Sequence, residues 1–579
     1  MKKILISLSA ALLVVLDIFV FGPFNIYQGN VDEFSIPLRS ILSTFLLPAM
    51  ILLLLLSLPS LMLSWKAHQV YVSILSVLGV LLWLQGNFLV WKYGLLDGQG
   101  IDWSIKVWRG WADAALWAAL LTMACLFFRK IYPLIARGSI ALACLLLVSL
   151  LITSFQKPEI WASRGKSLDR LIPAEKIFEF SPEQNVIHFV LDSFRSDLFE
   201  EIVTENMERY SKSLEGFTFF KEAIGTFPTT YMSVPAYLSG RIYKNRVPMQ
   251  EFVKQSNRGR TLARWLHNRG YETDLVASLR FTEGEPYSVR YRIAVPYSGT
   301  TRQYLRSNAA AMLDMSLFRQ VPHFLKRFIY NDERWLVQRL SSPRAHNLSL
   351  SYFSHQAFLD DMIKRLSATR RKPVYKYIHL VTTHPPIVVD KECQYAQGIP
   401  KTRESIKVQD RCSLDHLIKV LDKLRSEGLY DSSLIILQAD HGLSGGVDLN
   451  IQGNLDEEGL SVGGASLAEI ASSAAVLLAI KPPHSQGPLK ISRAQVALTD
   501  IRTTISSLLN VDKTLAGRSA YTVGEDEERE RRFYFYQWRN ENWQSAYFPR
   551  LDEFIIKGSV FDRNSWRWNR TYYPPTRSN

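Results

Sequence analysis

The stretch CSLDHLIKVLDKLRSEGLYDSSLIILQADHG (412–442) decides the class of fold. Its first half has apolar residues at helical spacing, Gly428 follows as a helix stop, and SLIILQAD then has the length and composition of a buried strand. The same order of helix, glycine and strand recurs at 260–277, while NVIHFVLD (185–192) and VYKYIHLVTTH (374–384) have the composition of further strands. Strands that alternate with helices predict a mainly parallel sheet flanked by helices.

Ionisable side chains stand at the carboxyl ends of three of these predicted strands. Asp192 ends the first strand, His384 ends the second, and Asp440 and His441 end the third. A single Asp in such a place is usually a turn former or a helix cap. In a parallel sheet, however, these ends lie at one edge, where ligands bind. The combination therefore predicts a functional site at that edge.

A hydroxyl group between the first two strands completes the candidate site. FPTTYMSVPAYLSG (227–240) predicts a short helix with Thr230 at its start. Carboxylates and imidazole are suitable ligands for Zn²⁺ or Mn²⁺, and a bound metal converts a hydroxyl into a nucleophile. The first amides of the helix would hold a phosphoryl group, and His384 would bind a phosphoryl oxygen or protonate a leaving group. The metal ligands predicted in this way are Asp192, Thr230, Asp440 and His441.

The first 155 residues differ in composition from the rest of the chain. They contain five apolar runs that are long enough, or nearly so, to cross a membrane as helices: 4–22, 41–64, 70–91, 111–128 and 138–155. A cleaved signal peptide is the alternative for the first run. Basic residues in alternate short loops place the N-terminus inside, so an odd number of spans leaves everything after residue 155 outside the cytoplasmic membrane.

Charge and cysteine content agree with an exported domain beside a membrane. The chain of 579 residues carries a formal net charge of +14, which favours nucleic acid or an anionic membrane as partner; the predicted topology excludes nucleic acid. Cys393 and Cys412 lie in the exported part, where an oxidising environment favours a disulfide between them, with two free thiols as the alternative. Cys125 and Cys144 lie in apolar runs and are expected to be inert core residues.

Changes in composition along the chain predict four parts. A five-helix transmembrane domain is expected at 1–155, and a polar linker at 156–182. The α/β catalytic domain is expected at 183–512. The aromatic segment 513–579 predicts a small antiparallel sheet.

The motifs FVLDSFRSD, TYMSVPAYLSG, VTTHPP and QADHG, in this order, resemble those of the alkaline phosphatase/sulfatase superfamily. With apolar runs in front, the chain looks most like the membrane-anchored branch, which contains phosphoethanolamine transferases, phosphoglycerol transferases and lipoteichoic acid synthases. The resemblance implies that Thr230 is the nucleophile and that His384 binds the substrate phosphate. It implies further metal ligands at Asp192, Asp440 and His441. In the sulfatase motif the nucleophile lies a fixed number of residues before a Thr-Gly pair, and the same count back from Ser239 and Gly240 reaches Thr230. Thr229 is the alternative nucleophile.

Departures from the superfamily motifs limit the expected reaction. Sulfatases that use formylglycine need Cys or Ser where Thr230 stands, so that chemistry is not expected. Relatives with two zinc ions have an Asp four residues before the histidine, and here that residue is Leu380. One divalent metal ion, Zn or Mn, is therefore expected. The transferases tend to have a further histidine after the DHG motif, and residues 443–464 contain none.

These features predict a membrane-bound, metal-dependent transferase. It would move a phospholipid headgroup, phosphoethanolamine or phosphoglycerol, through a phospho-threonine to an envelope glycan or lipid. The expected location is the bacterial cytoplasmic (inner) membrane, with several spans and with the catalytic domain on the periplasmic or extracellular face. The alternatives are a membrane-tethered hydrolase of phosphate or sulfuric esters and a non-catalytic lipid-binding relative.

Overall fold

The computed structural model divides the chain into two compact units. One unit comprises residues 1–172 and 294–350, and the other comprises 173–293 and 351–579. The structure describes residues 2–575 except 32, 33, 35, 92, 94–100, 102, 105, 106, 162–172, 278–280, 283, 295, 296, 298–300, 331–334, 342–350, 445–463, 512–516 and 539–544.

The first unit is helical. Its N-terminal elements are α1 (Lys2–Leu16), η1 (Asp17–Phe21), α2 (Gly22–Gly29), α3 (Leu38–Ser57), α4 (Pro59–Met62), α5 (Trp65–Asn87), α6 (Val107–Leu126) and α7 (Phe128–Gln156). Four segments are long and apolar enough to cross a membrane, namely Lys3–Gly29, Leu38–Met62, Trp65–Asn87 and Arg137–Gln156. The helices Val107–Leu126 and Phe128–Leu134 pass the same test only as a pair bent by 92°. The described residues thus contain four candidate spans by length and composition, or five if the bent pair is one, and the expected count of five is not confirmed.

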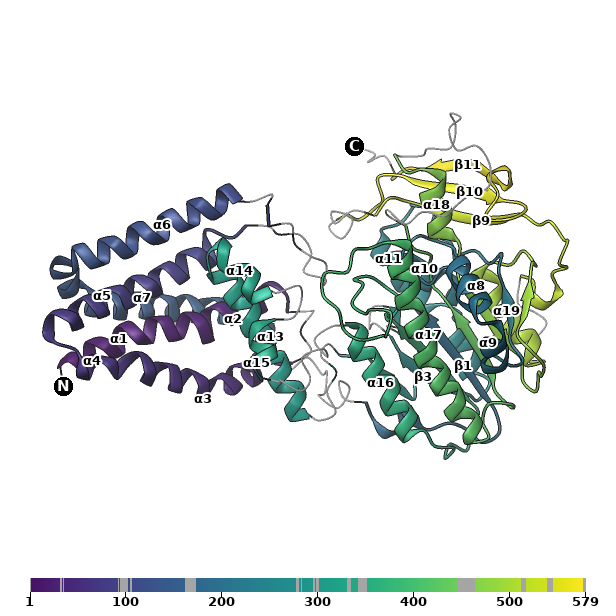
Figure 1. Cartoon of the computed structure of the whole chain (residues 1–579), viewed down its shortest axis with the longest axis horizontal. Helices are drawn as coiled ribbons and strands as arrows, with labels where there is room; N and C mark the ends of the chain where they lie inside the picture. The colour runs from purple at the N-terminus through teal and green to yellow at the C-terminus, as the bar shows by residue number, and fades with distance from the viewer. Residues whose placement is uncertain are drawn as a thin grey trace. The chain divides into compact units, whose positions relative to one another are not determined.

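Three helices from much later in the chain also belong to this unit. They are α13 (Thr301–Gln320), α14 (His323–Tyr330) and α15 (Leu336–Ser341). In Figure 1 they lie across one end of the bundle, where α13 packs on α2, α3 and α5, and α14 packs on α6. Tyr304 and Met312 of α13 share a buried core with Phe24 and Tyr27 of α2. The sequence had led us to expect one continuous domain at 183–512. Residues 294–350 interrupt it and belong to the helical unit, because apolar side chains of α13 pack with the N-terminal helices.

The second unit is built on an eight-stranded sheet in the order β4-β3-β5-β1-β6-β7-β2-β8. Its strands are β1 (Asn185–Leu191), β2 (Thr218–Phe220), β3 (Glu272–Val276), β4 (Val289–Tyr291), β5 (Val374–Leu380), β6 (Leu434–Gln438), β7 (Leu478–Lys481) and β8 (Lys490–Ser492). All neighbours are parallel except that β7 runs antiparallel to β6 and β2. Every residue of β1, β5 and β6 is buried, as in a sheet covered on both faces. The mainly parallel α/β fold is confirmed.

The helices of this unit include the one that opened the sequence analysis. They are α8 (Ser196–Glu205), α9 (Met207–Ser213), α10 (Thr230–Ser239), α11 (Met249–Arg258), α12 (Leu262–His267), α16 (Ser351–Arg365), α17 (Arg403–Ser426), α18 (Leu467–Ala474) and α19 (Ile501–Leu508). Thr402 and Ser405 form a capping box at the start of α17, which fixes where this helix begins. Gly428, with φ of 71°, then turns the chain toward β6.

The C-terminal segment forms the expected small antiparallel sheet. Its strands, in the order β11-β10-β9, are β9 (Arg531–Phe535), β10 (Leu551–Ile556) and β11 (Trp566–Tyr572). Phe533, Phe554 and Trp566 from these strands share a core with Ile470 of α18, and Figure 1 shows the strands beside that helix. The aromatic residues of this segment thus attach it to the main α/β fold.

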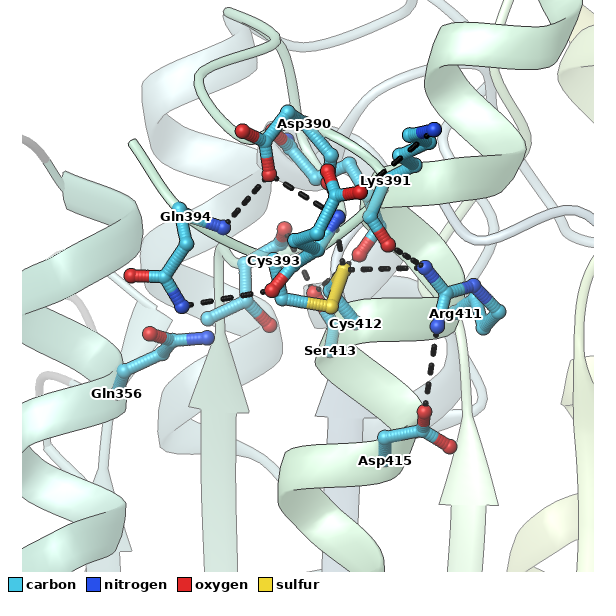
Figure 2. Close-up of a disulfide and its surroundings, with 12 residues drawn as sticks. Gln356, Asp390, Lys391, Cys393, Gln394, Arg411, Cys412, Ser413 and Asp415 are labelled. Atoms are coloured by element: carbon cyan, nitrogen blue, oxygen red, sulfur yellow. Dashed lines mark hydrogen bonds and ion pairs between the residues drawn. A yellow bond between two sulfur atoms is a disulfide. The ribbon is translucent and has the colours of Figure 1, made fainter. Parts of the chain in front are cut away.

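The predicted disulfide between Cys393 and Cys412 is present (Figure 2), with Cα atoms 5.5 Å apart. It joins the loop after β5 to α17. Asp390 stabilises this loop, because its carboxylate accepts hydrogen bonds from the amides of Glu392 and Gln394. The prediction that Cys125 and Cys144 lie in a core was wrong, since both are exposed on helices of the first unit. That they are inert stays a prediction.

Candidate metal centre

The candidate site lies where three central strands of the sheet end. β5, β1 and β6 are adjacent and parallel, so their carboxyl ends meet at one edge. Asp192 directly follows β1, and Asp440 and His441 follow β6 one residue beyond Ala439. All three side chains are buried. The parallel topology thus brings together the residues that the sequence pattern placed at strand ends.

His379 of β5, which the sequence analysis did not identify, completes this cluster. Its Nε2 atom lies 3.3 Å from Asp192 Oδ2 and 3.8 Å from Asp440 Oδ2. Asp192, His379 and Asp440 each offer a ligand atom within 4.8 Å of the others. The run VYKYIHLVTTH contains two histidines, and only the pairing of His379 with Val190 of β1 shows which of them faces the carboxylates.

The hydrogen bonds of the cluster leave atoms that fit a metal ion. Asp440 Oδ1 accepts the amides of Ser193 and His441 at 3.2 and 3.0 Å, while its Oδ2 is buried without a hydrogen bond. Asp192 Oδ1 and His379 Nε2 are also buried without a hydrogen-bond partner. Such atoms are costly to bury unless they bind a cation. Two carboxylates and an imidazole are ligands that suit Zn²⁺ or Mn²⁺.

Thr230, the predicted nucleophile, lies against this cluster at the start of α10. Its Oγ1 is 3.3 Å from Asp192 Oδ2 and 3.2 Å from His441 Nε2. Ser233, one turn further along α10, donates a hydrogen bond of 2.6 Å to the backbone oxygen of Asp440, which holds the helix on the end of β6. The alternative nucleophile, Thr229, is hydrogen-bonded through its hydroxyl to Tyr536. The geometry therefore favours Thr230.

Gly442 is required for the path of the chain after His441. A Cβ atom at this position would lie 2.1 Å from the backbone oxygen of Ser472 and 2.6 Å from that of Ala475. The sequence analysis did not indicate this contact with the end of α18. The close approach lets the Gly442 amide donate to the backbone oxygen of Ser473 at 2.9 Å, and it fixes the two metal-ligand candidates that precede the glycine.

The histidines and carboxylates of the cluster shift one another's pKa values. Burial by itself raises the pKa of Asp192, but His384, His379 and His441 together hold it well below its ordinary value. Burial lowers the pKa of His441, but the carboxylates of Asp440 and Asp192 outweigh this effect and raise it to about 9. The pKa of His379 is raised above its ordinary value in the same way. The two carboxylates thus create a site that attracts positive charge.

His384, the second predicted catalytic residue, stands apart from the buried cluster. It follows β5 and is exposed. Its backbone oxygen accepts a hydrogen bond of 3.3 Å from Gln409 of α17. His384 nevertheless helps to lower the pKa of Asp192, so it belongs to the rim of the site. The structure thus joins Asp192, Thr230, Asp440 and His441, adds His379, and leaves His384 at the surface.

A comparison with models of known protein families agrees with this fold. A family model described as Sulfatase matches residues 184–511. No match was found among curated proteins. Similar solved structures include a protein of the alkaline phosphatase superfamily from Vibrio parahaemolyticus, with 16% identity over 66% of this chain and 78% of that chain, at a TM-score of 0.38. The lipoteichoic acid synthase LtaP from Listeria monocytogenes has 12% identity over 68% and 89%, at 0.36. The periplasmic domain of EptC from Escherichia coli has 12% identity over 67% and 92%, at 0.33.

Proposed function

The chain belongs to the Sulfatase family, and on that premise we propose that it is a membrane-bound, metal-dependent transferase of phospholipid headgroups. Its family and its cluster of metal ligands make it an enzyme that transfers or hydrolyses phosphoryl or sulfuryl groups. The proposal adds that the donor is a phospholipid, that Thr230 carries the headgroup, and that an envelope glycan or lipid accepts it. The observation that carries the proposal is the position of the Thr230 hydroxyl between Asp192 and His441.

The identity of the nucleophile favours phosphoryl transfer over sulfatase chemistry. Formylglycine is made from Cys or Ser, and residue 230 is Thr. A threonine hydroxyl attacks phosphorus directly once it is activated. A divalent ion held by Asp192, His379, Asp440 and His441 would supply a Lewis acid beside this hydroxyl.

The first half of the reaction loads the headgroup onto Thr230. Oγ1 attacks the phosphorus of the phospholipid, and its proton passes to Asp192 Oδ2, which lies 3.3 Å away. The first amides of α10 face the incoming phosphoryl oxygens, because a helix N-terminus binds anions. The bond from phosphorus to the diacylglycerol oxygen breaks, and diacylglycerol leaves with a proton for which exposed His384 is the candidate donor. The headgroup stays on Thr230 as a phosphodiester.

The second half unloads Thr230. A hydroxyl of the acceptor attacks the same phosphorus and gives its proton to His384. The bond from phosphorus to Oγ1 breaks, and Oγ1 recovers its proton from Asp192. The acceptor oxygen then carries the headgroup, and the enzyme returns to its starting state. With water as acceptor the same steps would make the chain a hydrolase.

The location that we propose is the bacterial inner membrane, with the catalytic unit on the periplasmic or extracellular face. The apolar N-terminal helices support a membrane donor, since a phospholipid arrives in the plane of the bilayer. The disulfide between Cys393 and Cys412 supports an oxidising compartment. The net charge of +14 suits an anionic membrane surface and an anionic acceptor rather than nucleic acid on that side of the membrane.

The decisive experiment looks for the covalent intermediate. Purified full-length protein is incubated with Mn²⁺ or Zn²⁺ and headgroup-labelled phosphatidylethanolamine or phosphatidylglycerol, and its peptides are analysed by mass spectrometry. We expect a headgroup adduct on Thr230 that is lost in Thr230→Ala and kept in Thr229→Ala. An adduct on neither threonine, in protein shown to bind metal, would rule out both donors. Release of the labelled headgroup as a free phosphate ester, without its transfer to an added glycan or lipid, would identify a hydrolase.

A further inference from the structure

The helical unit contains a second buried polar cluster, centred on Asp17. This residue starts the π-helical turn η1 inside the apolar segment Lys3–Gly29. It is only 1% exposed, and neither of its carboxylate oxygens has a hydrogen-bond partner. Within the described part of the chain, no cationic side chain forms an ion pair with it. Ionisable residues inside apolar spans and single π-helical turns are both typical of functional sites.

Asp17 lines a small cavity that α13 closes from the other side. Ser316 and Gln320 of α13 are 0% and 4% exposed, and Ser316 Oγ and Gln320 Oε1 also lack hydrogen-bond partners. The helices approach closely because residue 22 is glycine, where a Cβ atom would lie 1.9 Å from Ser316 Oγ. Gln320 Nε2 donates to the backbone oxygen of Asp17 at 2.7 Å, which fixes the amide with its oxygen unsatisfied. The space has room for one group of the size of a water molecule.

The unpartnered atoms define what the cavity accepts. Two carboxylate oxygens, one amide oxygen and one hydroxyl oxygen are buried together, and none of them has a hydrogen-bond partner among the described residues. A group that donates several hydrogen bonds and carries one positive charge would satisfy these oxygens and the charge of the carboxylate together. A primary ammonium has both properties and the required size. Glycerol carries no charge, and trimethylammonium is larger and has no N–H donor.

One further residue of the cavity lining, Arg319, carries a positive charge. Arg319 lines the same cavity and is half-buried, with its Nε donating to the backbone oxygen of Gly86 at 2.6 Å. Asn25 and Asn87 also line it, and Asn87 is exposed, so the cavity reaches the surface there. A buried carboxylate and a guanidinium in one cavity match a zwitterion in which an ammonium and a phosphate are two carbons apart.

We propose that this cavity binds the headgroup of a phosphoethanolamine lipid, with its ammonium against Asp17, Ser316 and Gln320 and its phosphate near Arg319. This inference rests on the proposed function and narrows its donor to lipids with a primary ammonium. The inserted helix α13 would then help to select the donor, because it supplies two of the three residues around the ammonium.

The test measures lipid retention in the absence of turnover. Full-length Thr230→Ala protein is placed in nanodiscs that contain equal amounts of phosphatidylethanolamine, phosphatidylglycerol and phosphatidylcholine, and the retained lipids are counted by native mass spectrometry. We expect a preference for phosphatidylethanolamine of about tenfold. Asp17→Asn should abolish it by removing the charge, and Gly22→Ala should abolish it by filling the cavity. Arg306→Gln, an exposed position of α13, should leave it unchanged.

Several outcomes would overturn the proposal. Equal retention of the three lipids by the Thr230→Ala protein is one, and an unchanged preference in Asp17→Asn protein that keeps its thermal unfolding temperature is another. Competition by free phosphoethanolamine as strong as that by the lipid would identify a soluble amine as the ligand. Stabilisation by Na⁺ or K⁺ that depends on Asp17, without lipid preference, would identify a metal-cation site. If the labelling experiment gives an adduct on Thr230 but the nanodisc experiment shows no lipid preference, only this inference is refuted. If the nanodiscs show the preference but no adduct forms, only the transferase function is refuted.

Discussion

At the scale of single residues, His379 adds one candidate metal ligand to the set that the sequence predicted. Its Nε2 atom lies between both buried carboxylates, as the Nε2 atom of His441 also does. We expect His379→Gln to weaken Zn²⁺ or Mn²⁺ binding by at least about tenfold, because a ligand is removed from a site whose other atoms stay in place. Titration of the purified protein against a fluorescent chelator measures this affinity.

The matched control for that variant is His384→Gln, which changes the exposed histidine after the same strand. It should keep metal affinity and lower only the rate of headgroup transfer. Equal losses of metal affinity in both variants, or no loss in His379→Gln, would show that His379 is not a ligand.

Glu285 is a buried carboxyl group remote in sequence from the metal cluster, and it predicts a pH dependence. Burial raises its pKa from 4.5 to about 7, although Thr261, Arg264 and Arg290 act in the opposite direction. The folded state therefore binds more protons than the unfolded state between these two values. Its contribution to stability is full below about pH 4.5 and is lost as the pH rises through about 7, by at most about 1.4 kcal/mol per pH unit.

Glu285→Gln should accordingly flatten the decline of thermal stability over this interval. Unfolding temperatures of the parent and the variant, measured at several pH values from 4.5 to about 7, test the slope. Parallel curves for the two proteins would contradict the assignment.

At the scale of elements, the contact between the end of β6 and α18 holds the site together. Gly442→Ala would place a Cβ atom 2.1 Å from the backbone oxygen of Ser472, and backbone cannot move as a side chain does. We expect a loss of about 1–3 kcal/mol in the free energy of unfolding. We also expect weaker metal binding, because Asp440 and His441 must shift with the glycine.

Gly428, at the other end of β6, offers the control for this variant. Unlike Gly442 it has a positive φ, of 71°, and a Cβ atom there would meet no atom within 4 Å. Gly428→Ala should cost about 1 kcal/mol of stability through backbone strain and leave metal affinity intact. Metal affinity that falls equally in both variants would mean that general destabilisation, and not the displaced ligands, is responsible.

At the scale of the whole molecule, the number of spans decides on which side of the membrane the catalytic unit lies. Four spans and five spans predict opposite sides from the same N-terminus. Cys393 and Cys412 report the answer, because their disulfide lies in the catalytic unit. In a variant with Cys125 and Cys144 replaced by Ala, a membrane-impermeant reductant followed by an impermeant maleimide should label the pair in intact spheroplasts.

Two controls complete this experiment. Without reductant the pair should stay unlabelled, since both sulfur atoms are in the disulfide. If the pair is labelled without reductant, but only after the spheroplasts are lysed, the catalytic unit lies in the cytoplasm. The proposed lipid and glycan partners would then be on the other side of the membrane.

The sequence by itself predicted the α/β class, the antiparallel C-terminal sheet, the disulfide and the meeting of Asp192, Thr230, Asp440 and His441 at one edge of the sheet. These features could be predicted because the ends of strands, the glycines that end helices and the apolar runs are each visible in a short stretch of sequence. Parallel strands then bring their carboxyl ends to one edge of the sheet. Only the tertiary structure decided that His379 and not His384 joins the cluster, since this depends on the pairing of β5 with β1. It also decided that 294–350 packs with the N-terminal helices and encloses Asp17. Both results come from contacts between residues far apart in the chain, which no local pattern encodes.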